Sequence, residues 1–214
     1  MPVTGRVERW VPLSGGLATV LILLGSSLTS GGPDVDAAAD EIRAWYVDED
    51  TTILAGTYLL WLGALLLLPF AAFLGRVLRV GPSGNSWLHT TLVSGGATAT
   101  GLLLVGGIFH WVAASRPYWD ESLDPQVAKS LYTIGWDFSI LPALSLAALL
   151  GSAAVAGIRT GRLPRSLCWT AAVLAVASVL IWVLWFAFWL DLLWVGACGV
   201  FLVLRPRPVE PTRS

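Results

Sequence analysis

The chain has 214 residues, of which 56% are hydrophobic and only 13% are charged, and its formal net charge is -1. Soluble domains carry roughly a quarter charged residues, so a chain this poor in charge cannot cover a globular surface with polar groups. We therefore expect the lipid bilayer to be its main partner, and we expect no nucleic-acid partner. The 12 tryptophans also suit a protein with long membrane–water interfaces.

Apolar runs of about 20 residues predict membrane-spanning helices, because backbone groups in hydrocarbon must bond within their own segment. The run 127–158 is too long for a perpendicular crossing, so its first turns are expected in the outer headgroup region, or the helix is expected to tilt. The predicted fold class is all-α, a polytopic transmembrane helix bundle with six spans. They cover about 11–30, 52–75, 87–111, 127–158, 166–185 and 190–204.

The last apolar stretch, 166–204, is the ambiguous one. As one helix it would be about 58 Å long, roughly twice a hydrocarbon core. It is therefore expected to cross twice, with a tight reversal near 186–190. Asp191, the acidic residue of this stretch, lies beside the expected turn. The sixth helix is then short, and a five-helix alternative stays open.

Basic residues predict the orientation, because cytoplasmic flanks collect Lys and Arg. One side of the six-helix drawing holds Arg6, Arg9, Arg76, Arg79, Arg159, Arg162, Arg165, Arg205, Arg207 and Arg213. The other side holds most of the acids, namely Asp34, Asp36, Asp40, Glu41, Asp48, Glu49, Asp50, Asp120, Glu121 and Asp124. A five-helix chain would leave the 205–207 arginines outside, so the charges favour six helices with both termini in the cytoplasm.

The segment 34–47 carries apolar residues at helical spacing, including Val35, Ile42 and Tyr46, between acidic ones. Asp34 can cap a helix start and Pro33 marks the break before it, so we predict a short amphipathic helix on the outer surface. The inner loops are short turns rich in Gly and Pro. The chain 1–214 is therefore expected to form a single integral membrane domain, with 205–214 as a short cytoplasmic tail.

Small residues recur every four positions, a pattern that lets helix backbones approach closely in lipid. Ala148, Ser152 and Ala156 share one face, and Ala97 and Gly101 repeat the pattern in the span 87–111. These faces predict packing within the bundle. A homo-oligomer contact, or a contact with a membrane-protein partner, is the alternative.

Asp137 is the first candidate for a polar or ion site, because it falls about ten residues inside the span 127–158 with Pro142 nearby. An ionisable group at that depth is costly and by default marks a functional site. In the alternative, the helix enters the membrane later, and Asp137 is an interfacial residue paired with Lys129, Arg116 or His110.

Three further residues complete the candidate polar or ion site. Asp191 has the same two interpretations, and its place at the predicted turn favours the interfacial one. His110 lies at the outer end of the span 87–111, and Arg116 follows it as a possible partner for Asp137. No residue pattern in the chain indicates a catalytic group, a cofactor or a metal ligand set.

The segments TTILAGTYLLWLGALLLLPFAAFLGRVLR, AGIRTGRLPRSLCW and LLWVGACGVFLVLRPR resemble uncharacterised actinobacterial integral membrane proteins. The resemblance covers most of the chain and rests on length, loop pattern and the RTGRLPR-type inner turn. It implies six helices in a bacterial plasma membrane and carries no activity or site residues.

Three functions follow from these features. The favoured one is a multi-pass plasma-membrane protein without enzymatic activity, an accessory or interaction protein with acidic outer loops. The first alternative is a small transporter or cation- or proton-coupled carrier that uses Asp137. The second is an intramembrane enzyme, which the sequence disfavours because its membrane Ser and Thr residues have His nearby only at the interfaces.

Overall fold

The computed structural model describes residues 10–79, 86–119, 122–180 and 184–204, and the predicted tail 205–214 lies outside them. Every regular element in the described ranges is a helix, as the all-α prediction requires. The helices are α2 (Leu13–Thr29), α3 (Ala39–Asp48), α4 (Asp50–Val77), α5 (Ser86–Tyr118), α6 (Pro125–Ile140), α7 (Pro142–Thr160), α8 (Arg165–Ala177) and α9 (Leu184–Leu204).

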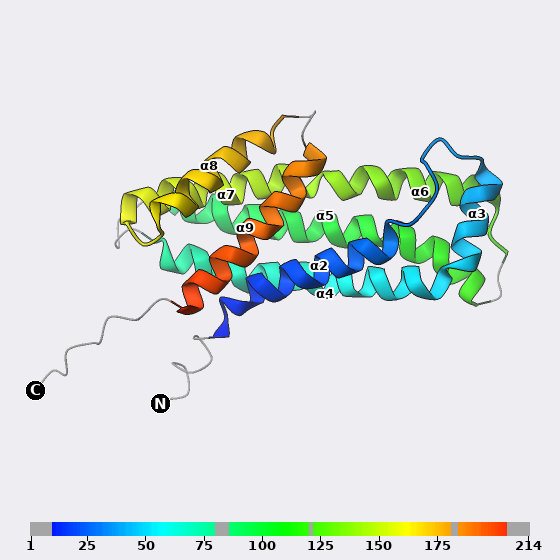
Figure 1. Ribbon diagram of the computed structural model, residues 1–214, viewed down its shortest axis with the longest axis horizontal. Helices are drawn as coiled ribbons and strands as arrows, with labels where there is room; N and C mark the ends of the chain where they lie inside the picture. Colours follow the sequence, from blue (N-terminus) through cyan, green and yellow to red (C-terminus); the bar gives the residue numbers. More distant parts are fainter. Residues whose placement is uncertain (1–9, 80–85, 120–121, 181–183, 205–214) are drawn as a thin grey trace, which may run out of the picture.

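The long helices form one elongated bundle (Figure 1). Contacts join α2 to α4, α4 to α5, α5 to α7, α7 to α9 and α9 back to α2, while α8 packs on α7 and α9. This closed ring encloses one apolar core, to which Ile22, Phe70, Leu146, Leu149 and Leu192 each contribute a fully buried side chain. The same helices leave many large apolar side chains exposed on the outer surface of the bundle.

Among the described residues, four segments are long and apolar enough to cross a membrane: Asp50–Val77, Trp87–Tyr118, Pro125–Thr160 and Trp185–Leu204. Two apolar helices, α2 and α8, are shorter. An apolar exterior on a bundle of such helices is the arrangement of a multi-pass membrane protein, in which lipid replaces water around the core.

Glycine allows α2 and α4 to approach with their backbones in contact. A Cβ atom added at Gly25 would lie 2.5 Å from the carbonyl oxygen of Gly56 and 2.6 Å from the backbone nitrogen of Leu60. The small-residue face predicted on α7 is likewise inside the bundle, with Ser152 and Ala156 buried. The predicted face on α5 differs: Ala97 and Gly101 are exposed on the outer surface, because neighbouring residues of that helix make its contacts.

The helices α4, α5 and α6 continue past the ends of α2 and α9, and α3 lies across their tips (Figure 1). A second apolar cluster holds this end together, formed by Ile42, Tyr46, Ile53, Ala113, Ala114, Leu123, Ala128 and Tyr132. We call this part of the molecule, residues 33–55, 111–119 and 122–135, the head. The predicted outer helix is present as α3, but it begins at Ala39, because 34–37 forms a turn closed by the Ala37 N–H to the Asp34 carbonyl. Its apolar face packs on protein.

The predicted span 127–158 is two collinear helices, α6 and α7, separated at Leu141. Pro142 begins α7 and has no N–H to donate to the carbonyl of Phe138, which interrupts the helical hydrogen bonds there. The predicted span 87–111 also proves longer, since α5 runs on to Tyr118 as part of the head.

The predicted boundaries of the last two helices were wrong. The fifth helix, α8, ends at Ala177 and not at 185, and α9 is already helical at Leu184 and not at 190. The reversal therefore lies between 177 and 184. Asp191 was assigned to a turn on the assumption that its carboxylate needs water, but the structure buries it within α9, where the hydroxyl of Ser178 donates to it over 2.8 Å.

Candidate functional site

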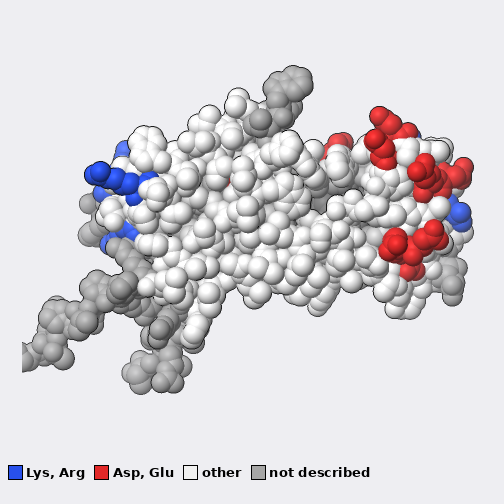
Figure 2. Space-filling model, viewed as in Figure 1, with Lys and Arg blue, Asp and Glu red and all other residues white. Residues whose placement is uncertain are grey.

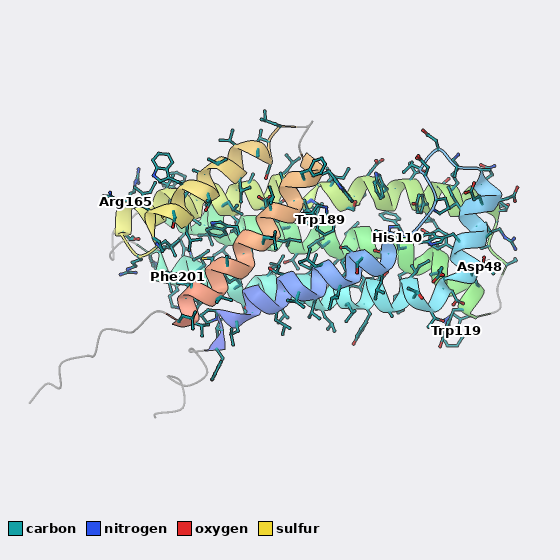
Figure 3. The ribbon with its side chains drawn as sticks, in the orientation of Figure 1. Asp48, His110, Trp119, Arg165, Trp189 and Phe201 are labelled. Atoms are coloured by element: carbon teal, nitrogen blue, oxygen red, sulfur yellow. The ribbon has the colours of Figure 1, made fainter. Side chains whose placement is uncertain are left out.

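A cavity of about 70 Å³ lies where the head joins the rest of the bundle. Its walls come from α2, α4, α5, α6 and α9. The polar atoms that line it belong to Ser26, Thr29, Ser30, Thr57, His110, Tyr132 and Ser139, and the aromatic walls come from Trp136, Phe138, Trp185, Phe188 and Trp189. His110 on α5 and Trp189 on α9, both labelled in Figure 3, line this cavity.

Tryptophan rings form one wall of the cavity. The rings of Trp136 on α6 and Trp185 on α9 stack with centroids 5.0 Å apart and an interplanar angle of 22°. Trp189, one turn further along α9, meets Trp185 edge to face at 5.6 Å. These contacts bind the first turns of α9 to α6 and present a broad aromatic surface to the cavity.

His110 lines the cavity from α5 and is held by the head. Its Nδ1 atom lies 2.9 Å from the hydroxyl oxygen of Tyr46, which comes from the buried face of α3. Gly135 leaves room for the imidazole, because a Cβ atom at that position would lie 2.9 Å from Nε2 of His110. The ring also packs edge to face on Tyr132, with centroids 6.0 Å apart.

The hydrogen bond to Tyr46 defines which nitrogen of His110 carries the proton. Burial, together with the charge of Tyr132, raises the pKa of Tyr46 above its ordinary value of 10.0, so the phenol stays protonated. Its single proton has no other acceptor among the described residues, and the phenol therefore donates to Nδ1 of His110. In the neutral imidazole the ring proton is then on Nε2, which has no hydrogen-bond partner in the described part of the chain.

Thr57 adds a second polar atom without a partner. Its side chain is 1% exposed, and its Oγ1 atom makes no hydrogen bond. The methyl group faces α5, since a Cβ atom at Gly107 would lie 3.2 Å from Cγ2 of Thr57. A buried threonine in a helix commonly donates to a carbonyl of the preceding turn, as Thr100 does to Gly96 over 2.9 Å. Thr57 does not do so, and its hydroxyl is therefore an unsatisfied donor in a residue that lines the cavity.

The structure separates the four residues that the sequence nominated. His110 lines the cavity, whereas Asp137 and Asp191 do not. Asp137 is exposed on the outer surface of α6, and no hydrogen bond or ion pair of a described residue involves it. Asp191 is fully buried with Ser178, and its Oδ1 atom has no partner. Arg116 is exposed in the last turn of α5.

Sequence reasoning did not identify Thr57, Tyr46 or the tryptophan pair as parts of one site. Thr57 lies in an apolar run in which a single hydroxyl ordinarily bonds its own helix, and Tyr46 was placed on the apolar face of the outer helix. One signal was available: tryptophans are concentrated toward the outer ends of the predicted spans. Their meeting around a cavity depends on the packing of α6 against α9.

Within the described residues, no group of three or more His, Cys, Asp or Glu side chains is placed to hold a metal ion. Cys168 and Cys198 are both buried and free. No protein-family model, curated protein or solved structure matches this chain. The site must therefore be interpreted from its own chemistry.

Proposed function

We propose that this chain is a multi-pass plasma-membrane protein of bacteria that crosses the bilayer six times and presents its folded, acidic head outside the cell. In this proposal both termini are cytoplasmic, and the protein acts without catalysis, as an accessory protein that binds a partner through the head. The observation that carries the proposal is the separation of charge along the bundle. Lys and Arg gather at one end, and Asp and Glu dominate the other, where fewer Lys and Arg lie among them (Figure 2).

Helix lengths support this placement in the membrane. The helices α2, α7 and α9 have 17, 19 and 21 residues, which correspond to about 26 to 32 Å and match a hydrocarbon core of about 30 Å. With α8 as a further, shorter crossing, the inner parts of α4 and α5 complete six spans. The basic residues Arg159 and Arg165 then fall at the cytoplasmic surface, as the positive-inside rule requires.

The head then projects from the outer surface. The end of α2 meets α4 at Gly56, where an added Cβ atom would lie 3.0 Å from the methyl of Thr29, and the start of α9 meets α6 at Trp136. The part of α6 before Trp136 extends about 16 Å beyond that level. Hydrogen bonds brace it: Arg43 donates to the carbonyl of Leu123 and Lys129 to that of Ala37, both over 2.8 Å.

An ordered, acidic surface on α3 suits a partner with a basic outer face, because complementary charge steers association and selects partners. Asp40, Glu41 and Asp48 are exposed on this helix. The carrier alternative would need a cation site inside the bundle. Its candidate, Asp137, is on the outside of α6, so our proposal assigns it no role in binding.

The test combines topology with binding. In a background with both native cysteines replaced by alanine, Asp48→Cys should react with a membrane-impermeant maleimide in intact cells, and Arg159→Cys only after permeabilisation. Partners crosslinked in vivo should be lost when Asp40, Glu41 and Asp48 are changed to their amides, and retained when Arg159 and Arg165 are changed to glutamine. Labelling of Arg159→Cys in intact cells, or equal loss in both charge variants, would refute the proposal.

A further inference from the structure

We propose that the cavity between the head and the bundle binds an uncharged, lipid-soluble molecule through a carbonyl oxygen, which accepts hydrogen bonds from Thr57 and His110. Two sources share this chemistry: the acyl ester of a bilayer lipid and the ring carbonyl of a quinone. The inference goes beyond the proposed function, because it concerns a small molecule and not the partner of the head. It shares with that function only the placement of the bundle in lipid.

Two unsatisfied donors define the polarity of the ligand. The Thr57 hydroxyl is buried without a partner, and His110, whose partly exposed ring carries its proton on Nε2, lines the same cavity. Leaving a buried donor without a hydrogen bond is costly. Such groups in a folded protein therefore ordinarily have a partner, supplied by protein, water or ligand. Both groups can donate, so a ligand that satisfies both needs two acceptor lone pairs, which a single oxygen atom can supply. A carbonyl oxygen fits this requirement.

The lining argues against a charged ligand. The residues described around the cavity include no Asp, Glu, Lys or Arg, so neither a cation nor an anion would find an opposite charge there. Burying an unpaired charge among aromatic and leucine side chains is strongly unfavourable. The walls instead favour an apolar body, since Leu102, Leu103 and Phe188 lie beside the stacked tryptophans.

The size and the level of the cavity indicate which part of the ligand enters. A volume of about 70 Å³ holds a carbonyl group and a few carbons, or about two water molecules at roughly 30 Å³ each. The rest of the molecule must therefore lie outside. The cavity is at the level where α2 ends and α9 begins, which in the proposed placement is the boundary between headgroups and hydrocarbon. Acyl esters occupy this depth in a bilayer.

The head contacts the cavity through His110, one of the two proposed hydrogen-bond donors to the ligand. Tyr46 of α3 supplies the proton that holds Nδ1 of His110 as an acceptor and Nε2 as a donor. Tyr132, which also lines the cavity, donates to the carbonyl of Pro33 over 2.6 Å and thereby fixes the segment leading into α3. Occupation of the cavity is thus expected to order α3, the acidic surface that the head presents.

The experiment uses the full chain in nanodiscs of a defined phosphatidylcholine, with two probes that each carry a ten-carbon chain: a decyl-substituted benzoquinone and a decanoyl ester of glycerol. Equilibrium binding is measured for the parent protein and for Thr57→Val, which keeps the shape of the side chain and removes the hydroxyl. The matched control is Thr98→Val, the same change at an exposed position of α5. Lipids retained through purification are identified by mass spectrometry for the same three proteins.

We expect one probe to bind the parent protein and Thr98→Val alike, and to bind Thr57→Val roughly tenfold more weakly, the effect of losing one hydrogen bond to a buried acceptor. Preference for the ester assigns the site to bilayer lipid, and preference for the quinone assigns it to a redox lipid. The ligand-free Thr57→Val protein should melt no lower than the parent, which shows that it folds. Equal affinities for Thr57→Val and Thr98→Val, or no binding of either probe, would mean that the cavity holds water only and would overturn the proposal.

Discussion

The hydroxyl oxygen of Tyr46 lies 2.9 Å from Nδ1 of His110. This contact joins residues 64 positions apart in the chain and links α3, at the tip of the head, to the wall of the cavity. Both rings also pack on Tyr132, so an aromatic cluster connects the acidic surface to the interior. A change at either residue should therefore affect stability and the order of α3 together.

Tyr46→Phe removes the donor and leaves Nδ1 of His110 without its partner. The expected cost is about 1 to 2 kcal/mol of stability, measured as a lower melting temperature in detergent. Because the folded-state pKa of Tyr46 is raised above 10.0, the parent protein should also lose stability as the pH rises above that value, and the variant should lose less. Tyr58→Phe, at an exposed tyrosine of α4, is the control and should change neither quantity.

Ser178→Ala should destabilise the contact between α9 and the segment after α8. It removes the hydroxyl that donates to the buried carboxylate of Asp191, at an expected cost of about 2 kcal/mol. Asp191→Asn should be at least as stable as the parent, because it keeps an acceptor for Ser178 and removes a charge from the interior. Ser27→Ala, where an exposed hydroxyl bonds only the carbonyl of Leu24, is the matched control. Equal melting temperatures for Ser178→Ala and Ser27→Ala would contradict this account.

Gly25→Ala should separate α2 from α4. The added methyl would meet backbone atoms of Gly56 and Leu60, which cannot rotate away, so we expect a loss of about 2 kcal/mol or more. Gly101→Ala places the same methyl in open space on α5, and should be neutral or stabilising by about 0.5 kcal/mol, since alanine favours a helix. Thermal unfolding of both variants in detergent tests the prediction, and it fails if the two changes have the same effect.

Lys129→Met should loosen the segment that leads into α3. The ammonium group donates to the carbonyl of Ala37, so its removal is expected to speed amide exchange over 34–38 several-fold while leaving α7 protected. Exchange followed by mass spectrometry in nanodiscs measures this directly. Arg159→Met, at the opposite end of the bundle, should leave the exchange of 34–38 unchanged.

Sequence reasoning identified the helices, but it failed where tertiary contacts determine a helix boundary or the burial of a side chain. The hydropathy of the runs was sufficient to locate α2, α4 and α7, because in lipid a long apolar segment has to be a helix. The extension of α5 to Tyr118 was missed, since its outer turns are amphipathic and pack on α3. Asp191 was misplaced because a carboxylate was assumed to need water, whereas a single serine from a neighbouring segment accompanies it in the interior. The cavity was not predictable, as its two donors come from different helices.

Asp137 provides the sharpest test of how deep the bundle lies in the membrane. The sequence alone placed it about ten residues inside the span 127–158. In the structure it follows Trp136, which stacks on the first turn of α9, and its side chain is exposed. Together with the proposed placement, this puts Asp137 in the outer headgroup region.

In the background without native cysteines, Asp137→Cys should therefore react with an impermeant maleimide added to intact cells. Leu144→Cys, also exposed but seven residues or about 10 Å deeper, should stay unlabelled, because thiolates do not form in hydrocarbon. Asp137→Asn should change the melting temperature by no more than an ordinary surface substitution, within about 0.5 kcal/mol. If Asp137→Cys is as unreactive toward the maleimide as Leu144→Cys, the membrane boundary lies further out. Asp137 is then an intramembrane carboxylate.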